Sequence, residues 1–174
     1  MRRPSLLISL VVVAVLLTGC LTPKANVKIE PNPIVLTAEK LLDNDFVIKD
    51  IKLNLRTSGF STGYIIEGAR VAVLDEEDKS VFEKMIDIGK KTPIIPGVSH
   101  TEEVPAVSLN DLFDFDVDED LDIGIPIDDE DYDELLKEQF TKYYDENWKG
   151  KTYRLTVIIT GKNPTTDTAD IRFE

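Results

Sequence analysis

The chain has 174 residues, with 33 acidic and 20 basic side chains, one Cys and one His. This length suits a single domain with one well-buried core rather than several domains. The negative charge argues against nucleic acid as a partner, because the phosphate backbone would repel it. A lone Cys excludes an intramolecular disulfide, and a lone His excludes a multi-histidine metal site.

Residues 1–19 have the pattern of a signal peptide. Two arginines precede an apolar run at 6–17 that would span about 18 Å as a helix, well short of the roughly 30 Å hydrocarbon core. The run ends in Leu-Thr-Gly-Cys at 17–20, which resembles the lipobox of prokaryotic lipoproteins, where the Cys is lipidated and the chain is cut before it. We therefore predict lipidation at Cys20, since the alternative, a buried free Cys, does not explain this ending.

The lipid chains predict attachment to the extracytoplasmic face of a membrane, with residues 20–26 as a short tether. Removal of residues 1–19 leaves 155 residues with a net charge of −15, because two arginines leave and no acidic residue does. The membrane is therefore the first expected partner, contacted through the lipid anchor. A protein or another envelope component is the second.

Branched and aromatic residues that alternate with polar ones predict short β-strands from Val27 onward. Two prolines interrupt the first, 27–36, which predicts an edge strand that bulges or changes partner. The second, 46–57, places Ile51, Leu53 and Leu55 on one face.

The middle of the chain predicts a hairpin. Strands at 64–74 and 80–88 flank the acidic turn 75–78, and Gly68 inside the first is expected to mark a bulge. Residues 92–97 then predict a rigid connector. Further strands are expected through Val104 and Val107, at 151–160 and at 169–173, the last after a turn at 161–164.

One helix is predicted at 129–149, before the last two strands. Its apolar residues recur at spacings of three and four, its first turn is acidic, and Gly150 follows as a stop. The stripe is expected to pack over a sheet rather than to form an exposed binding platform, and it comprises Tyr132, Leu135, Leu136, Phe140, Tyr143, Tyr144 and Trp148.

These elements predict a mainly β fold, an antiparallel immunoglobulin-like β-sandwich over 27–174 with an acidic insert at 110–128. Ile95-Pro96-Gly97, residues 103–109 (Glu-Val-Pro-Ala-Val-Ser-Leu) and residues 153–157 (Tyr-Arg-Leu-Thr-Val) resemble the water-stress and hypersensitive-response type of late-embryogenesis-abundant domain. The resemblance extends over 27–173 in element order. It implies an immunoglobulin-like sandwich without a catalytic site and with a protective or interaction role.

The acidic segment is the most unusual part of the sequence. Residues 111–134 hold thirteen carboxylates and no Lys or Arg, and residues 113–123 alternate between apolar and acidic side chains. An extended chain would place five aspartates on one face, and a curled chain would offer their oxygens to calcium. The candidate calcium ligands are Asp114, Asp116, Asp118, Asp120 and Asp122.

Two other interpretations of this segment stay open. It could be a solvated charged edge that prevents pairing between sheets or a partly disordered acidic insert, and otherwise it could be an acidic patch for a basic partner. Calcium is the one candidate cofactor.

Catalysis has little support in the sequence. His100 has Ser99, Thr101 and two glutamates nearby, but neighbouring residues on a strand point to opposite faces. We expect a non-catalytic, lipid-anchored binding or protective domain at the cell surface, stabilised by calcium if the aspartates converge. The alternative is a metal-assisted extracytoplasmic hydrolase that uses the aspartates of 114–122.

Overall fold

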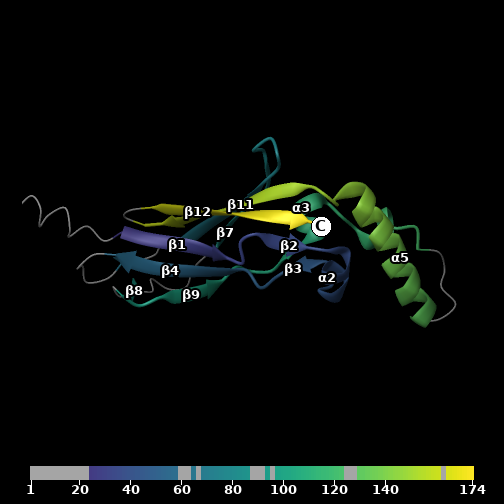
Figure 1. The fold of residues 1–174 in the computed structure, drawn as a ribbon, viewed down its shortest axis with the longest axis horizontal. Coiled ribbons are helices and arrows are strands. Elements are labelled where there is room, and N and C mark those ends of the chain that lie inside the picture. Colours follow the sequence, from purple (N-terminus) through teal and green to yellow (C-terminus); the bar gives the residue numbers. More distant parts are fainter. Residues whose placement is uncertain are drawn as a thin grey trace, which may run out of the picture.

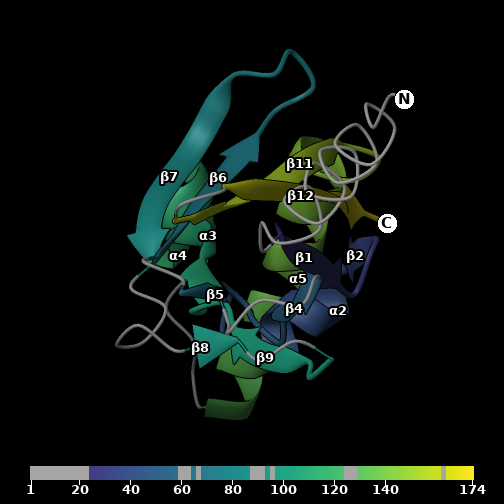
Figure 2. The same cartoon turned by 90° about the vertical axis from the view of Figure 1, so that its left-hand side faces the viewer.

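A computed structural model describes residues 24–58, 64–65, 68–86, 93–94, 97–123, 129–161 and 164–174. The protein is mainly β, as predicted, and its two principal sheets form facing layers in an elongated, sandwich-like body (Figures 1 and 2). One sheet has the order β1 (Lys24–Glu30), β4 (Lys52–Ser58), β9 (His100–Glu103). The other has the order β2 (Ile34–Leu36), β12 (Thr165–Phe173), β11 (Thr152–Thr160), β6 (Gly68–Leu74), β7 (Ser80–Ile86).

Two short strand pairs and four helices complete the described part of the chain. β3 (Val47–Ile48) pairs with β10 (Val107–Ser108), and β5 (Tyr64–Ile65) pairs with β8 (Pro93–Ile94). The helices are α2 (Ala38–Asp43), α3 (Leu109–Phe113), α4 (Val117–Asp120) and α5 (Asp129–Asn147).

The first predicted strand changes sheets at its prolines, as expected. β1 pairs antiparallel with β4, whereas β2 pairs parallel with the end of β12 in the opposite layer. Where β1 passes β12, the backbone N–H of Ile29 donates to Asp167 Oδ2 at 2.8 Å and ties the two layers together. The parallel pair corrects the expectation of a wholly antiparallel sandwich.

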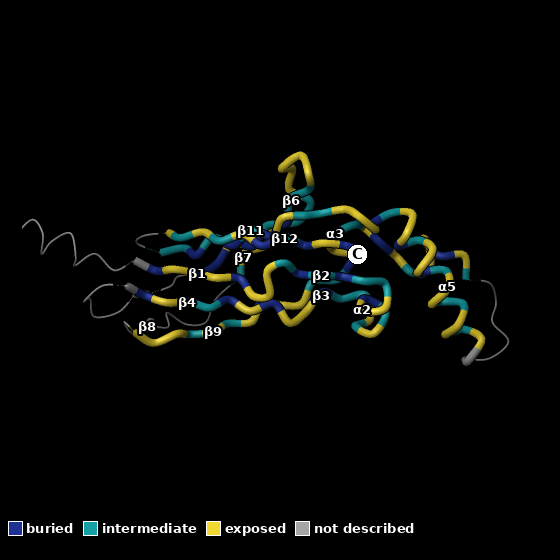
Figure 3. Tube along the Cα trace, viewed as in Figure 1, coloured by how far each residue is buried: buried dark blue, intermediate teal, exposed yellow. Residues whose placement is uncertain are grey.

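The alternating faces predicted for the long strands are confirmed. Ile51, Leu53 and Leu55 are buried, and they face buried residues of β6, β11 and β12 across the core (Figure 3). Burying one such side chain contributes about 1.5–3 kcal/mol, so this shared core is the main source of stability. The opposing residues are Ala69, Val71, Val73, Leu155, Val157, Ile159, Ala169 and Ile171.

The hairpin of β6 and β7 is confirmed, but its bulge is not at the predicted glycine. The register shifts between Val73 and Leu74. At Gly68 a Cβ atom would lie 3.2 Å from the carbonyl oxygen of Ile86, so this glycine permits close approach of the two strands.

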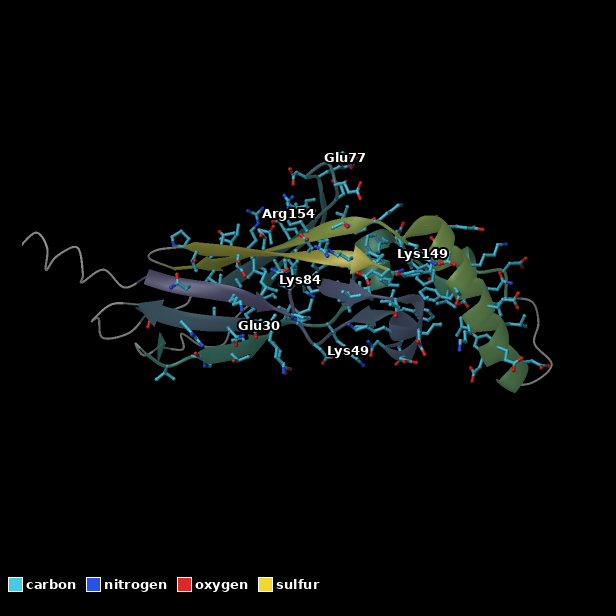
Figure 4. All side chains as sticks on the ribbon, viewed as in Figure 1. Glu30, Lys49, Glu77, Lys84, Lys149 and Arg154 are labelled. Atoms are coloured by element: carbon cyan, nitrogen blue, oxygen red, sulfur yellow. The ribbon has the colours of Figure 1, made fainter. Side chains whose placement is uncertain are left out.

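β7 forms one edge of the five-stranded sheet, and a lysine lies at its centre. Lys84 is opposite the buried Val71, on the inner face of the sheet, yet its side chain is exposed (Figure 4). A charged side chain on the inner face of an edge strand opposes pairing with another chain, because a partner strand would bury the charge.

Three predicted segments need correction, and one helix was missed. β1 begins at Lys24, so residues 24–26 belong to the sheet rather than to a tether. Pro93 and Ile94 pair with β5 and are not simply a connector. The last strand starts at Thr165, four residues earlier than expected. Helix α2 was not predicted, although Thr37 caps it by accepting a hydrogen bond from the Lys40 N–H.

The predicted long helix is confirmed as α5, and it covers one end of the sandwich (Figure 1). Phe140, Tyr144 and Trp148 are buried, while Tyr132, Leu135, Leu136 and Tyr143 are half-buried. Gly150 follows with φ +81°, the left-handed conformation typical of a helix stop.

Nine aromatic rings meet under α5, and we call them the aromatic cluster. Neighbouring ring centroids lie 4.8–6.4 Å apart, the separation at which tilted pairs attract one another. The cluster joins α5 to the turn after α2, to the acidic segment and to the last two strands. Its members are Phe46, Phe113, Phe115, Phe140, Tyr143, Tyr144, Trp148, Tyr153 and Phe173.

Tyr144 fixes α5 to the ends of two strands. Its hydroxyl lies 2.8 Å from the Leu36 carbonyl oxygen and 2.9 Å from the Glu174 carbonyl oxygen, so its single proton is shared between two acceptors. The side chain is 1% exposed. Burial, together with the carboxylates of Asp145 and Glu174, raises the pKa of Tyr144 to about 12.

We expect Tyr144→Phe to lower the free energy of unfolding by about 1–2 kcal/mol, because two carbonyl oxygens lose a buried donor. Urea denaturation followed by the fluorescence of Trp148, the single Trp, measures the change. Tyr132→Phe removes the same atom from a half-buried ring of the same helix and is the matched control. Equal stability of the two variants would contradict the expectation.

The raised pKa of Tyr144 also predicts a pH dependence. The folded state favours the neutral phenol, so its contribution is complete below about pH 10, the usual tyrosine pKa, and is lost as the pH rises towards 12. The wild type should lose at most about 2–3 kcal/mol through this group. Urea midpoints measured from pH 9 to pH 12 should therefore fall more steeply in the wild type than in Tyr144→Phe. Equal slopes in the two proteins would contradict a raised pKa of Tyr144 in the folded state.

Candidate functional site

The predicted lipidation residue, Cys20, lies outside the described residues. The first described residue, Lys24, starts β1 at the end of the body opposite α5 (Figure 1). Within the described part of the chain, no helix has the length and apolar character needed to cross a bilayer.

The acidic segment is folded into helical turns between residues 109 and 120 rather than extended. Ser108 caps α3 by accepting a hydrogen bond from the Asp111 N–H at 3.0 Å, and Asp114 ends the helix in a left-handed conformation with φ 56°. An aspartate tolerates this conformation better than most residues do. Residues 113–123 therefore do not form the extended chain that would place five aspartates on one face.

Two of the predicted calcium ligands stabilise α4 instead. An Asp116 carboxylate oxygen accepts a hydrogen bond from the Asp118 N–H at 2.8 Å, and Asp120 accepts one from the Asp116 N–H at 2.8 Å. The positive end of the helix dipole also stabilises carboxylates at the first turn of a helix. Negative charge is thus compatible with this short helix.

The apolar and acidic side chains of this segment do lie on different sides, although the helical turns that separate them were not predicted. Phe115 is 3% exposed and Leu121 is 6% exposed, and Phe113 packs against Trp148 and Phe173. All five predicted aspartates are exposed. The apolar residues of the segment pack into the aromatic cluster, and its aspartates remain in contact with water.

The described residues form no ready metal centre. No group of three or more His, Cys, Asp or Glu side chains in the ranges described is placed to hold one metal ion. A hollow of about 400 Å³ lies between α4 and the turn after α2, and Asp45, Asp116 and Asp118 line it without converging. The calcium prediction therefore gains no support from these positions.

Sequence reasoning missed the turn beside that hollow. Asp45 and Phe46 both have left-handed backbones, with φ 53° and φ 59°, and such a conformation is rare for a bulky aromatic residue. Packing holds it, since Phe46 lies against Phe115 and Phe140 while its carbonyl oxygen accepts from the Leu109 N–H at 2.9 Å. The Asn-Asp dipeptide at 44–45 was the available turn signal.

His100 forms a pair with Glu102 rather than a catalytic set. Its Nε2 lies 2.5 Å from Glu102 Oε1, and both residues are opposite buried leucines of β4. The neighbouring hydroxyls point elsewhere, because Ser99 Oγ accepts from Arg56 Nε at 2.7 Å and Thr101 donates to Asn54 at 2.9 Å. Neither of these two neighbouring hydroxyls therefore joins the pair.

A polar network covers the outer face of the three-stranded sheet. Glu30 lies 3.0 Å from Lys28 Nζ and accepts from Asn54 Nδ2 at 2.6 Å. The hydrogen bond and charge of Lys28 lower the pKa of the Glu30 carboxyl. The adjacent hollow of about 280 Å³ is slightly smaller than a typical small-molecule site, so we assign it no ligand.

Comparisons with known proteins identify no relative, since no family model, no curated protein and no solved structure matches the chain. The resemblance to late-embryogenesis-abundant domains therefore rests on the sequence elements alone.

We expect calcium to raise the melting temperature of the unlipidated chain, residues 21–174, only gradually and without saturation, because the described aspartates do not converge. The control is the triple variant Asp118→Asn, Asp120→Asn, Asp122→Asn, followed by calorimetry over the same titration. A saturable rise in the wild type that disappears in the triple variant would restore the predicted calcium site.

Proposed function

We propose that the protein is a lipid-anchored, non-catalytic binding or protective domain on the extracytoplasmic face of a membrane. The observation that carries the proposal is Cys20, which closes an apolar run in the sequence Leu-Thr-Gly-Cys. The thiol accepts the lipid, and small residues at 18 and 19 let the chain enter a peptidase cleft. Two or more acyl chains then hold the protein stably at the membrane.

The fold is compatible with such an anchor. β1 starts four residues after Cys20, so a lipidated Cys20 joins almost directly onto the sheet. The opposite end of the body carries α5 and the acidic segment. An anchor at Cys20 therefore leaves the outer faces of both sheets and the exposed face of α5 open to partners.

The second prediction, a metal-assisted hydrolase, needs several of the 114–122 aspartates around one cation. Their described positions, exposed and partly engaged as helix caps, favour the binding or protective domain. His100 likewise has Glu102 beside it, while the neighbouring hydroxyls of Ser99 and Thr101 bond to other residues. The identity of the bound partner stays a prediction, with an envelope component or protein expected and nucleic acid not expected.

The proposal predicts a lipid on Cys20. Cells expressing the full chain in the presence of a labelled lipid precursor should yield a labelled mature protein, and mass spectrometry should find the modification on an N-terminal Cys20. Cys20→Ser should abolish the label.

Thr18→Ser is the matched control, because it keeps a small residue two positions before the cleaved bond and should leave labelling intact. Cleavage at another position, or an unlabelled wild type, would overturn the proposal. An unprocessed wild-type chain that stays in the membrane would point to a spanning anchor instead.

A further inference from the structure

The two ends of the sandwich differ in their distance from the proposed anchor. β1 begins at one end of the long axis, and α5 lies at the other (Figure 1). The strand β12 runs between these ends, from Thr165 to Phe173, and Phe173 packs against Trp148. The eight residue-to-residue steps from Thr165 to Phe173, at about 3.3 Å each, place the aromatic cluster about 26 Å from the start of β12.

The connection between Cys20 and the sheet is shorter than the body. Four bonded steps separate Cys20 from Lys24, and a fully extended chain covers about 3.5 Å per step, or about 14 Å in all. The proposed anchor therefore cannot let the body turn over and bring α5 to the bilayer while β1 points away from it.

The distribution of charge favours an upright over a flat orientation of the body on the membrane. Residues 109–123 and 129–149, around α5, carry fifteen acidic and three basic side chains. Residues 24–28 and 54–58, the paired ends of β1 and β4, carry three basic residues and no acidic one. Glu30 offsets the charge of Lys28 at 3.0 Å, so this end has a net charge of +2. Anionic headgroups attract the second group and repel the first, and the repulsion fades within about 10 Å of the surface.

We infer that the mature protein stands upright on the membrane, with the β1–β4 end against anionic headgroups and α5 outermost. This inference rests on the proposed lipid anchor at Cys20. In this orientation the acidic end lies beyond the reach of headgroup repulsion, whereas a flat orientation would bring that end to the surface. The interacting surface is the end formed by residues 24–28 and 54–58, and its partner is the headgroup layer.

Two matched Thr→Cys variants of the lipidated protein test the orientation. Thr166 is exposed near the β1–β4 end and Thr141 is exposed on α5, and Cys20 itself is blocked by the lipid. Each introduced thiol receives a fluorophore, and the proteins are reconstituted in vesicles of phosphatidylglycerol and phosphatidylcholine with nitroxide-labelled headgroups. We expect quenching to be several-fold stronger at position 166 than at position 141.

Equal quenching at the two positions, stronger quenching at 141, or no quenching at either would overturn the upright orientation. Insertion of twenty Gly and Ser residues between Pro23 and Lys24 should reduce the difference, because the longer tether frees the body. Flotation with the vesicles is measured first. A protein that does not float shows that the proposed anchor has failed, and one that floats but quenches equally shows that only the orientation has failed.

Discussion

The packing of α5 across the end of the sandwich is the constraint on which the rest of the structure depends. Its aromatic face joins segments that are far apart in the sequence, from the turn at Phe46 through the acidic segment to the last strand. Each tilted ring pair contributes about 0.5–1.5 kcal/mol beyond the area that it buries. The acidic segment has no comparable reason to fold without this apolar surface, because its carboxylates repel one another.

The same packing explains why an exceptionally acidic stretch is ordered in its described part. Phe113, Phe115 and Leu121 supply apolar contacts, and the intervening aspartates remain hydrated or cap the short helices. The segment is thus a two-sided element whose inner side is structural. Its outer side gives the protein a strongly negative pole at the end farthest from the proposed anchor.

The sequence was most informative where apolar residues recur at one regular spacing over many residues. β4 and β11 were predictable because apolar residues that become buried alternate with residues that are less buried, and α5 was predictable from its apolar stripe at spacings of three and four. The acidic segment misled because a period of two also arises when short capped turns place every second residue inward. Its capping residues, Ser108 and Asp116, were the available signal. No local pattern could reveal the left-handed backbone of Phe46, because ring contacts from distant segments hold it. Apart from its prolines, the first predicted strand likewise has no local pattern that shows its move to the opposite sheet.

The place of β12 has a consequence for how the chain is made. This strand is the last in the sequence, yet it lies between β2 and β11 and contributes Ala169, Ile171 and Phe173 to the core. A nascent chain in which β12 has not yet been made has no strand to pair with β2, and Trp148 lacks its ring contact with Phe173. Completion of the core therefore waits until β12 has been synthesised, and until then the strands made earlier keep apolar faces exposed that the native fold buries.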